Sequence, residues 1–235
     1  MFTESAELYD LVYGSFKNYE VESDKIAALL SSARPGLRSV LDVACGTGEH
    51  ARQLRLRHGL HVDGIDLDPK FVEIARRKNP ESTFTLANMS DFHVPNRYDA
   101  VVCLFSSIGY VRTLDNVRDA FECFRRHIDP LGIVVVEPWL PPGVIDPSRR
   151  STDVGEAEGI RVVRHARVDA KDRMSWIHFD YEITDANGTR KTSEVHELGL
   201  FTPDEMLDAF RSVGLAATFD PQGLIGRGLY VARVA

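Results

Sequence analysis

The stretch "VLDVACGTGEHA", residues 40 to 51, decides the fold that this sequence predicts. An apolar run leads into a turn that contains Gly46 and Gly48, and the small residue Ala51 follows three positions later. This spacing fits the G-x-G-x-x-G/A pattern of a strand, a tight turn and a helix that together bind a dinucleotide. Asp42, however, lies just ahead of the glycines, where a pyrophosphate would meet a negative charge. The stretch therefore predicts a cofactor site and leaves open which cofactor occupies it.

Strand-like and helix-like segments alternate on both sides of this stretch. The expected strands are 40–44, 61–67, 83–87, 98–105 and 132–138, and the expected helices are 49–58, one that begins at Asp68–Pro69, and 117–128. The run 98–105 is nearly all apolar, which is typical of a strand buried on both faces. The alternation predicts an α/β fold with a doubly wound, mainly parallel sheet and helices on both sides.

The pattern changes after Pro138. Three runs with strand-like alternation follow, at 159–170, 173–185 and 189–201, and no helical pattern lies between them. We expect these runs to form an antiparallel β insertion. A helix capped by Thr202 and two final strands, 216–220 and 228–234, then return to the first sheet. The expected organisation is a cofactor-binding core over 1–138, the insertion over 139–199 as a substrate or dimer region, and the rest of the core over 200–235.

Composition and charge narrow the class of protein. The net charge of −7 argues against a nucleic-acid partner, because phosphate contacts need a basic face. The three cysteines are odd in number and lie in or beside apolar segments, which favours reduced, buried thiols in a cytoplasmic protein. The first ten residues do not have the pattern of a signal peptide, and no apolar run approaches the roughly 20 residues of a membrane span.

The charge of Asp42 distinguishes two classes of cofactor. A dinucleotide places its pyrophosphate at the helix N-terminus, and an acid beside it opposes binding. S-adenosylmethionine has no phosphate and brings an ammonium and a sulfonium cation, which an acid favours. Asp66, at the end of the second strand, can accept hydrogen bonds from ribose hydroxyls of either cofactor, so it does not discriminate. Asp42 therefore favours S-adenosylmethionine, with an NAD-dependent oxidoreductase as the alternative.

Three segments, "VLDVACGTGEH", "GIDLDPKFVEIAR" and "YDAVVCLFSSIGYV", together resemble the successive motifs of class I S-adenosylmethionine-dependent methyltransferases. Over nearly the whole chain the sequence is similar to the sugar N,N-dimethyltransferases of macrolide pathways, which methylate the amine of a dTDP-linked 3-amino deoxysugar. The segments "AELYDLVY", "GIVVVEPW" and "GRGLYV" carry this closer resemblance. It implies a seven-stranded Rossmann-like methyltransferase sheet, S-adenosylmethionine as cofactor, a nucleotide-linked amino sugar as acceptor, and a homodimer.

The resemblance also implies roles for individual residues. The implied cofactor-binding residues are Asp42, Ala44, Gly46, Gly48, Asp66, Leu67, Asn88, Met89, Phe105 and Ser106. It places Tyr13 and Tyr110 near the acceptor amine as catalytic residues, and Tyr110 stands where the sugar enzymes carry a histidine. Trp139, His178 and Arg227 are expected to bind the sugar nucleotide, with Arg227 as a partner for phosphate. No metal site is expected.

Methyl transfer to an amine makes modest demands on a protein. Much of the acceleration can come from alignment of the acceptor nitrogen, the methyl group and sulfur, and a neutral amine needs no strong base. A hydroxyl acceptor would call for a base or a metal. Methylation of another small-molecule amine or hydroxyl and cofactor binding without catalysis stay open. A nucleic-acid methyltransferase is disfavoured by the net charge and by the absence of an N/D-P-P-Y/F motif.

Overall fold

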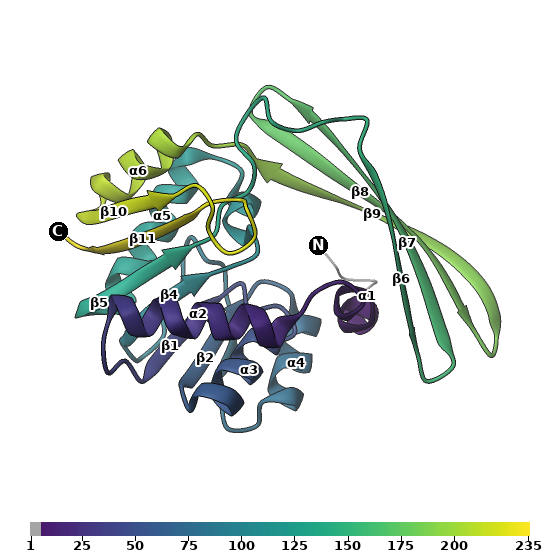
Figure 1. Ribbon diagram of the computed structural model, residues 1–235, viewed down its shortest axis with the longest axis horizontal. Coiled ribbons are helices and arrows are strands. Elements are labelled where there is room, and N and C mark those ends of the chain that lie inside the picture. The colour runs from purple at the N-terminus through teal and green to yellow at the C-terminus, as the bar shows by residue number, and fades with distance from the viewer. Residues whose placement is uncertain (1–5) are drawn as a thin grey trace.

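The computed structural model describes residues 6–235, which form a seven-stranded sheet and a separate four-stranded sheet (Figure 1). Residues 1–5, half of the segment inspected for a signal peptide, lie outside the described residues. The seven strands, in the spatial order β10-β11-β5-β4-β1-β2-β3, are β1 (Ser39–Val43), β2 (His61–Asp66), β3 (Phe84–Leu86), β4 (Tyr98–Cys103), β5 (Ile128–Val136), β10 (Leu215–Asp220) and β11 (Leu229–Val234). Strand β11 pairs antiparallel with β5 and β10, and the other pairs are parallel. The predicted mainly parallel sheet of seven strands is confirmed.

Helices cover both faces of this sheet, as the alternation predicted. They are α2 (Tyr19–Ala33), α3 (Glu49–His58) and α4 (Pro69–Lys78) on one face, and α5 (Leu114–His127) and α6 (Pro203–Ser212) on the other. Successive side chains of β4 belong to different cores because a strand points them to opposite faces. Val101 and Cys103 pack with α5 and α6, whereas Ala100 and Val102 pack with α2, α3 and α4. The apolar run of β4 is therefore buried on both sides.

The glycine turn joins β1 to α3 at the carboxyl end of the sheet. Gly48 is the N-cap of α3 and has a left-handed φ of 74°. A Cβ atom there would lie 2.9 Å from Asn79 Nδ2 and 3.0 Å from the Ala75 Cβ, so helix α4 approaches the turn too closely for a side chain. Gly48 is thus required by backbone conformation and by helix packing together.

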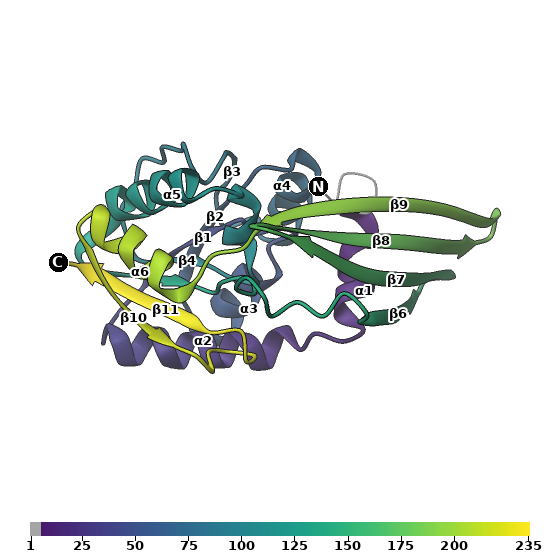
Figure 2. The same ribbon diagram turned by 90° about the horizontal axis from the view of Figure 1, so that it is seen from above.

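The predicted antiparallel insertion has four strands rather than three. These are β6 (Arg150–Ala157), β7 (Ile160–Lys171), β8 (Met174–Asp185) and β9 (Gly188–Gly199), paired in sequence order and antiparallel. The sequence did not reveal β6 because most of its residues are polar and exposed, without the alternation of a half-buried strand. The other three strands begin and end within two residues of their predicted bounds. Figure 2 shows the whole sheet extending away from the core as a separate layer.

A short N-terminal segment lies between the two sheets (Figure 1). It consists of the 3₁₀ turn η1 (Ala6–Leu8) and helix α1 (Tyr9–Gly14). Leu8 and Val12 share a small core with Val162 and Phe179 of the insertion, while the η1 residues also contact helix α4 of the main core. At Gly155 on β6, a Cβ atom would lie 2.5 Å from the Leu11 carbonyl oxygen, so α1 rests directly on the strand. This contact fixes the N-terminal segment to the insertion.

The three cysteines lie in the interior of the protein. Cys45, Cys103 and Cys123 are all buried and unpaired, as predicted. Within residues 6–235, no helix combines the length and the apolar character needed to cross a bilayer.

We expect Gly48→Ala to destabilise the protein more than Gly59→Ala. Gly59, at the other end of α3, has a similar φ of 66° but no atom within 4 Å of its added Cβ. Gly59→Ala should lower the free energy of unfolding by about 1–2 kcal/mol through left-handed strain alone. Gly48→Ala should lose a further 1–3 kcal/mol, roughly, from the clash with α4. Urea unfolding of both variants without ligand measures this, and equal losses would contradict a packing role for Gly48.

Candidate active site

A cavity of about 1050 Å³ lies between the carboxyl edge of the seven-stranded sheet and the inner face of the insertion. In open α/β sheets, ligands bind in the crevice at the carboxyl ends of the strands, which is where this cavity lies. The predicted residues that line it are Tyr13, Ala44, Gly46, Asp66, Leu67, Asn88, Met89, Phe105, Ser106, Tyr110, Trp139 and Arg227. Residues proposed for the cofactor and residues proposed for the acceptor therefore line one continuous space.

Asp42 borders a smaller adjoining cavity of about 40 Å³, which shares Ala44, Gly46 and Phe105 with the large one. Its side chain is 2% exposed, and its Oδ2 atom has no hydrogen-bond partner among residues 6–235. Burial, followed by the charge of Asp66, raises the pKa of Asp42 to about 7. A buried carboxyl group with an unused oxygen fits a cationic ligand group, such as the ammonium of S-adenosylmethionine.

The carboxylate of Asp66 is oriented by the backbone around it. Its Oδ2 accepts the Gly46 N–H at 2.8 Å and its Oδ1 accepts the Asp68 N–H at 2.9 Å. Burial raises the pKa of Asp66, although these hydrogen bonds act in the opposite direction. A carboxylate has about four lone-pair sites, so two acceptor positions remain for hydroxyl groups. The geometry agrees with a ribose-binding acid.

Three side chains after β2 and β3 form the rim of the cavity beside Asp66. Leu67 is exposed, Met89 is half-buried, and both offer apolar surface to the cavity. Asn88 is exposed and its Oδ1 accepts the Ser90 N–H at 3.0 Å, which closes a local turn. The amide oxygen keeps a second lone pair that can accept from an amino group. Such a rim suits the flat face and the amino edge of an adenine.

Left-handed backbone marks the ends of β1 and β4. Ala44, Phe105 and Ser106 have φ values of 60°, 52° and 64°, which residues other than glycine rarely adopt. Glu137 at the end of β5 accepts the Phe105 N–H at 2.7 Å, and Ser106 Oγ donates to the Pro138 carbonyl at 2.7 Å. Strain of this kind persists only where surrounding contacts hold it, and it is frequent at ligand sites. No motif in the sequence marks Glu137 as a site residue.

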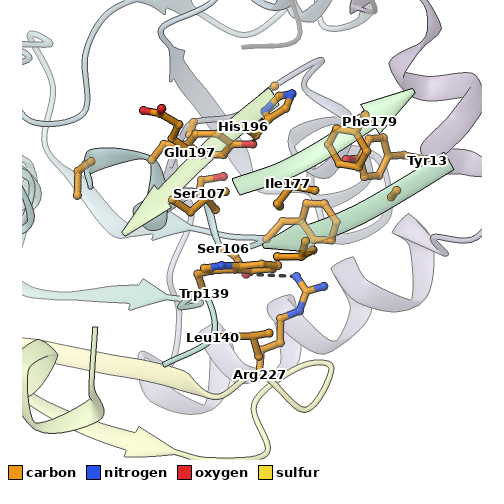
Figure 3. A pocket seen from close by; sticks show the side chains of 18 of the residues that line it. Tyr13, Ser106, Ser107, Trp139, Leu140, Ile177, Phe179, His196, Glu197 and Arg227 are labelled. Carbon is orange, nitrogen blue, oxygen red and sulfur yellow. Dashed lines mark hydrogen bonds between the residues drawn. The ribbon is translucent and has the colours of Figure 1, made fainter. Parts of the chain in front are cut away.

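On the acceptor side, Arg227 lies beside the ring of Trp139 (Figure 3). Its guanidinium carbon is 5.2 Å from the Trp139 ring centre and 5.5 Å from that of Phe105, and Nη1 donates to Ser106 Oγ at 3.2 Å. Burial lowers the pKa of Arg227 from its usual range. Trp139 is itself held by a hydrogen bond from Nε1 to Ser175 Oγ of β8 at 3.0 Å. The arrangement presents a preformed, partly buried cation to the cavity.

Tyr13 of α1 and Arg164 of β7 form a second pair of buried groups in the cavity lining. The Tyr13 ring is 6% exposed and stands edge-on to Phe105, with ring centres 5.6 Å apart. The guanidinium carbon of Arg164 lies 4.6 Å from the ring centres of both Tyr13 and Phe179, and Nη2 bonds to Asp153 at 2.7 Å. Sequence reasoning missed Arg164, although its alternation with the inward-facing residues of β7 was a usable signal.

Tyr110 belongs to the 3₁₀ segment η2 (Ser107–Val111), which follows β4. Its hydroxyl lies 2.9 Å from Nδ1 of His196 on β9, and both residues line the cavity. His196 did not emerge from the sequence, because 86 positions separate it from Tyr110 and no motif marks the pair.

Two predicted site residues, His178 and Gly48, line neither the large cavity nor the smaller one beside Asp42. His178 lies on the opposite face of β8 from Ile177 and Phe179, which do line the cavity, and its Nε2 is 3.1 Å from Asp169 Oδ2. Alternation along a strand alone cannot tell which face is inner, so the sequence did not exclude this placement. Gly48 lies where the turn packs against helix α4, and it does not line the cavity.

The fold and the site together define an S-adenosylmethionine-dependent methyltransferase. The sequence model of the family described as "Methyltransferase domain" matches residues 40–132, which span the glycine turn and strands β1 to β4. Among curated proteins, the chain is 38% identical to the dTDP-3-amino-3,6-dideoxy-alpha-D-glucopyranose N,N-dimethyltransferase of Streptomyces fradiae, over 97% of this chain and 89% of that one. The chain belongs to this family of sugar N,N-dimethyltransferases.

Solved structures agree with this assignment over nearly the full length. Streptomyces venezuelae DesVI superposes with a TM-score of 0.92 at 34% identity, and the match covers 99% of both chains. CalS10, described as an amino pentose methyltransferase from Micromonospora echinaspora with bound S-adenosylmethionine, gives a TM-score of 0.87 at 31% identity and 97% coverage of both chains. The cofactor of this enzyme is S-adenosylmethionine.

We expect Asp42→Asn to stabilise the ligand-free protein at neutral and alkaline pH. Because burial raises the folded pKa of Asp42 to about 7, ionisation destabilises the folded state as pH rises from about 4 through 7. The variant should therefore match the wild type near pH 4 and exceed its free energy of unfolding by roughly 1–4 kcal/mol at pH 8.

Asp99→Asn provides a control of opposite sign for this measurement. Asp99 accepts the backbone N–H groups of Arg38 and Ser39, and the pKa of Asp99 is lowered, with these bonds outweighing burial. That variant should lose stability at pH 8 and little at low pH. Urea unfolding across pH 4–8 distinguishes the two, and a pH-independent effect of Asp42→Asn would refute the buried-charge account.

Proposed function

We propose that this enzyme transfers methyl groups from S-adenosylmethionine to the amine of a nucleotide-linked amino deoxysugar and methylates it twice. The observation that carries the proposal is the continuous cavity, which is lined both by the carboxylate of Asp66 beside the glycine turn and by the guanidinium of Arg227 beside Trp139. The activities by which its relatives are named, dTDP-amino-sugar N,N-dimethyltransferases, support the same substrate class.

The carboxyl end of the sheet supplies the proposed contacts to the cofactor. Asp42 would face its ammonium, Asp66 its ribose hydroxyls, and Leu67 and Met89 the adenine ring, with Asn88 at the amino edge. S-adenosylmethionine, when bound, supplies an electrophilic methyl group on a sulfonium. Phe105 and Ser106, held in their left-handed turn, would exclude water at the meeting point of cofactor and acceptor.

The insertion and the C-terminal loop supply the proposed contacts to the acceptor. Arg227 would bind a phosphate, and the exposed Arg149 in the cavity lining adds a second cation for a diphosphate. Trp139 would form a wall beside the sugar, while Tyr13 and Tyr110 would face the nitrogen. The chain thus positions the amine by shape and hydrogen bonds, which is the main demand of the reaction.

We also propose that the enzyme is a cytoplasmic homodimer. Strands β6 and β9 are the edges of the insertion sheet within the described residues, and an open sheet edge favours self-association. The three unpaired, buried cysteines fit a reducing compartment.

Incubation of the purified enzyme with S-adenosylmethionine should convert a dTDP-linked amino deoxysugar to its dimethylamino form, with two S-adenosylhomocysteine molecules released per acceptor. Mass spectrometry of both products measures this. The matched control is the same sugar nucleotide with a hydroxyl in place of the amine, which should not be methylated. Faster turnover of a simple amine or an amino acid than of every amino-sugar nucleotide would reject the proposed acceptor and leave the methyltransferase class intact.

Arg227→Ala should raise the acceptor KM by about 10- to 100-fold with kcat within a few-fold of the wild type. A charge-assisted hydrogen bond is worth about 1.5–3 kcal/mol, and a phosphate contact remote from the reaction is equal in ground and transition states. The control is Arg161→Ala, because Arg161 is exposed on β7 and pairs with Glu156 outside the cavity lining. A loss confined to kcat would show that Arg227 does not bind the phosphate.

A further inference from the structure

A line of hydrogen-bonding side chains leads from the acceptor part of the cavity into the insertion. Tyr110 lines the cavity, and its hydroxyl lies 2.9 Å from His196 Nδ1. The other ring nitrogen, Nε2, lies 3.2 Å from Glu194 Oε2. His196 is 1% exposed and the Glu194 side chain 7%, so both are almost fully removed from water. Figure 3 shows His196 on the inner face of the insertion, near Phe179 and Ile177.

The carboxylate fixes the direction of these hydrogen bonds. An ionised carboxylate can only accept, so the Nε2 atom facing Glu194 carries the hydrogen. The neutral ring then has Nδ1 as its acceptor, and the Tyr110 hydroxyl donates to it. The phenolic oxygen retains lone pairs that can accept an N–H from a ligand in the cavity. The three groups are therefore arranged to receive a proton at Tyr110 and to pass one on to His196.

Twofold methylation of an amine produces protons that must be removed. The attacking nitrogen uses its lone pair to form an N–C bond while the electrons of the broken S–C bond stay on sulfur, which leaves a methylammonium. That ion has no lone pair and cannot attack again until it loses a proton. An amine that arrives as an ammonium has the same requirement before the first transfer. A protein group that lines the cavity, such as the Tyr110 hydroxyl, can take this proton directly.

We propose that Tyr110, His196 and Glu194 form a proton relay that neutralises the acceptor ammonium before each methyl transfer; this inference rests on the function proposed above. The ammonium gives a proton to the Tyr110 oxygen, while the Tyr110 hydroxyl proton moves to His196 Nδ1. The result is a neutral amine, a neutral tyrosine and an imidazolium paired with the Glu194 carboxylate. After the product leaves, the proton returns through Tyr110 to water in the cavity. Tyr110 touches the substrate, and His196 and Glu194 act through it as positioning residues.

The electrostatic surroundings keep both rings neutral at rest, so the imidazolium forms only transiently during the transfer. Burial lowers the pKa of His196, so the ring is neutral and able to accept a proton at pH 7, and Glu194 supports the imidazolium once it forms. Burial raises the pKa of Tyr110 well above its usual value, so a phenolate does not accumulate. Among residues 6–235, the other charged or titratable groups that act on the pair are Arg164 of β7, Tyr181 of β8, Tyr13 of α1 and Asp66.

The pH dependence of turnover tests the relay. At pH 6.5, where the free amine is mostly protonated, His196→Asn and Tyr110→Phe should each lower kcat by about 10-fold or more. At pH 9.5, where the amine enters neutral, both variants should be within about threefold of the wild type. The double variant should lose no more than either single one, because the two residues act in series. His165→Asn, an exposed histidine on the outer face of the same sheet, should match the wild type at both pH values.

Two further measurements separate the relay from a structural role. S-adenosylmethionine affinity by calorimetry should stay within about twofold in both variants. In protein labelled with ¹³C-histidine, the spectrum at pH 7 should show one neutral imidazole held as the Nε2–H tautomer, and this signal should be absent in His196→Asn. A loss of equal size at pH 6.5 and 9.5, or no loss, would overturn the relay. Failure of the wild type to methylate any amino-sugar nucleotide would instead overturn the proposed function.

Discussion

Buried acidic side chains at the carboxyl edge of the seven-stranded sheet constrain the rest of this structure. Three acids lie at or beside the ends of strands: Asp42 near the end of β1, Asp66 at the end of β2, and Glu137 just after β5. Burial raises the pKa of each. Their protein partners offset only part of the lost solvation: two N–H groups serve Asp66 and one serves Glu137. In its left-handed turn, Phe105 directs its N–H to Glu137 and so gives that carboxylate a partner. A cation that binds at this edge replaces part of the stabilisation that the carboxylates lost with their hydrating water.

The opposite wall of the cavity combines aromatic and apolar side chains with cations. The insertion, helix α1 and the loop between β10 and β11 contribute apolar and aromatic side chains with two cations among them. Arg164 lies near Tyr13 and Phe179, and Arg227 lies against Trp139. Guanidinium groups stacked on aromatic rings keep their charge while the rings exclude water. One wall therefore carries negative groups that suit a cationic cofactor, and the other carries positive groups that suit an anionic acceptor. The two ligands meet where the walls converge.

The sequence predicted those parts of the fold that depend on local chemistry. Helix α3 begins and ends at the predicted residues because glycines stand at both of its ends, and the two apolar faces of β4 were evident from its composition. Strand β6 was missed since its exposed, polar residues carry no alternation. His178 was assigned to the site without knowledge of which face of β8 is inner. The contact between Tyr110 and His196 depends on two segments that only the tertiary fold brings together, so no spacing rule could reveal it.

The topology has a consequence for the order in which this chain can acquire its structure during synthesis. Helix α1 rests on β6 and β7, which are made more than 130 residues later, and β11 lies between β5 and β10 although it comes last in the sequence. The edge of β5 that pairs with β11, and the apolar side chains of Leu8 and Val12, thus stay uncovered while the ribosome is still extending the chain. A nascent chain of this kind is exposed to aggregation until its final residues emerge. A chain that stops just before β11 loses an inner strand of the sheet rather than an edge, and the loop that holds Arg227 is left unanchored at its C-terminal end.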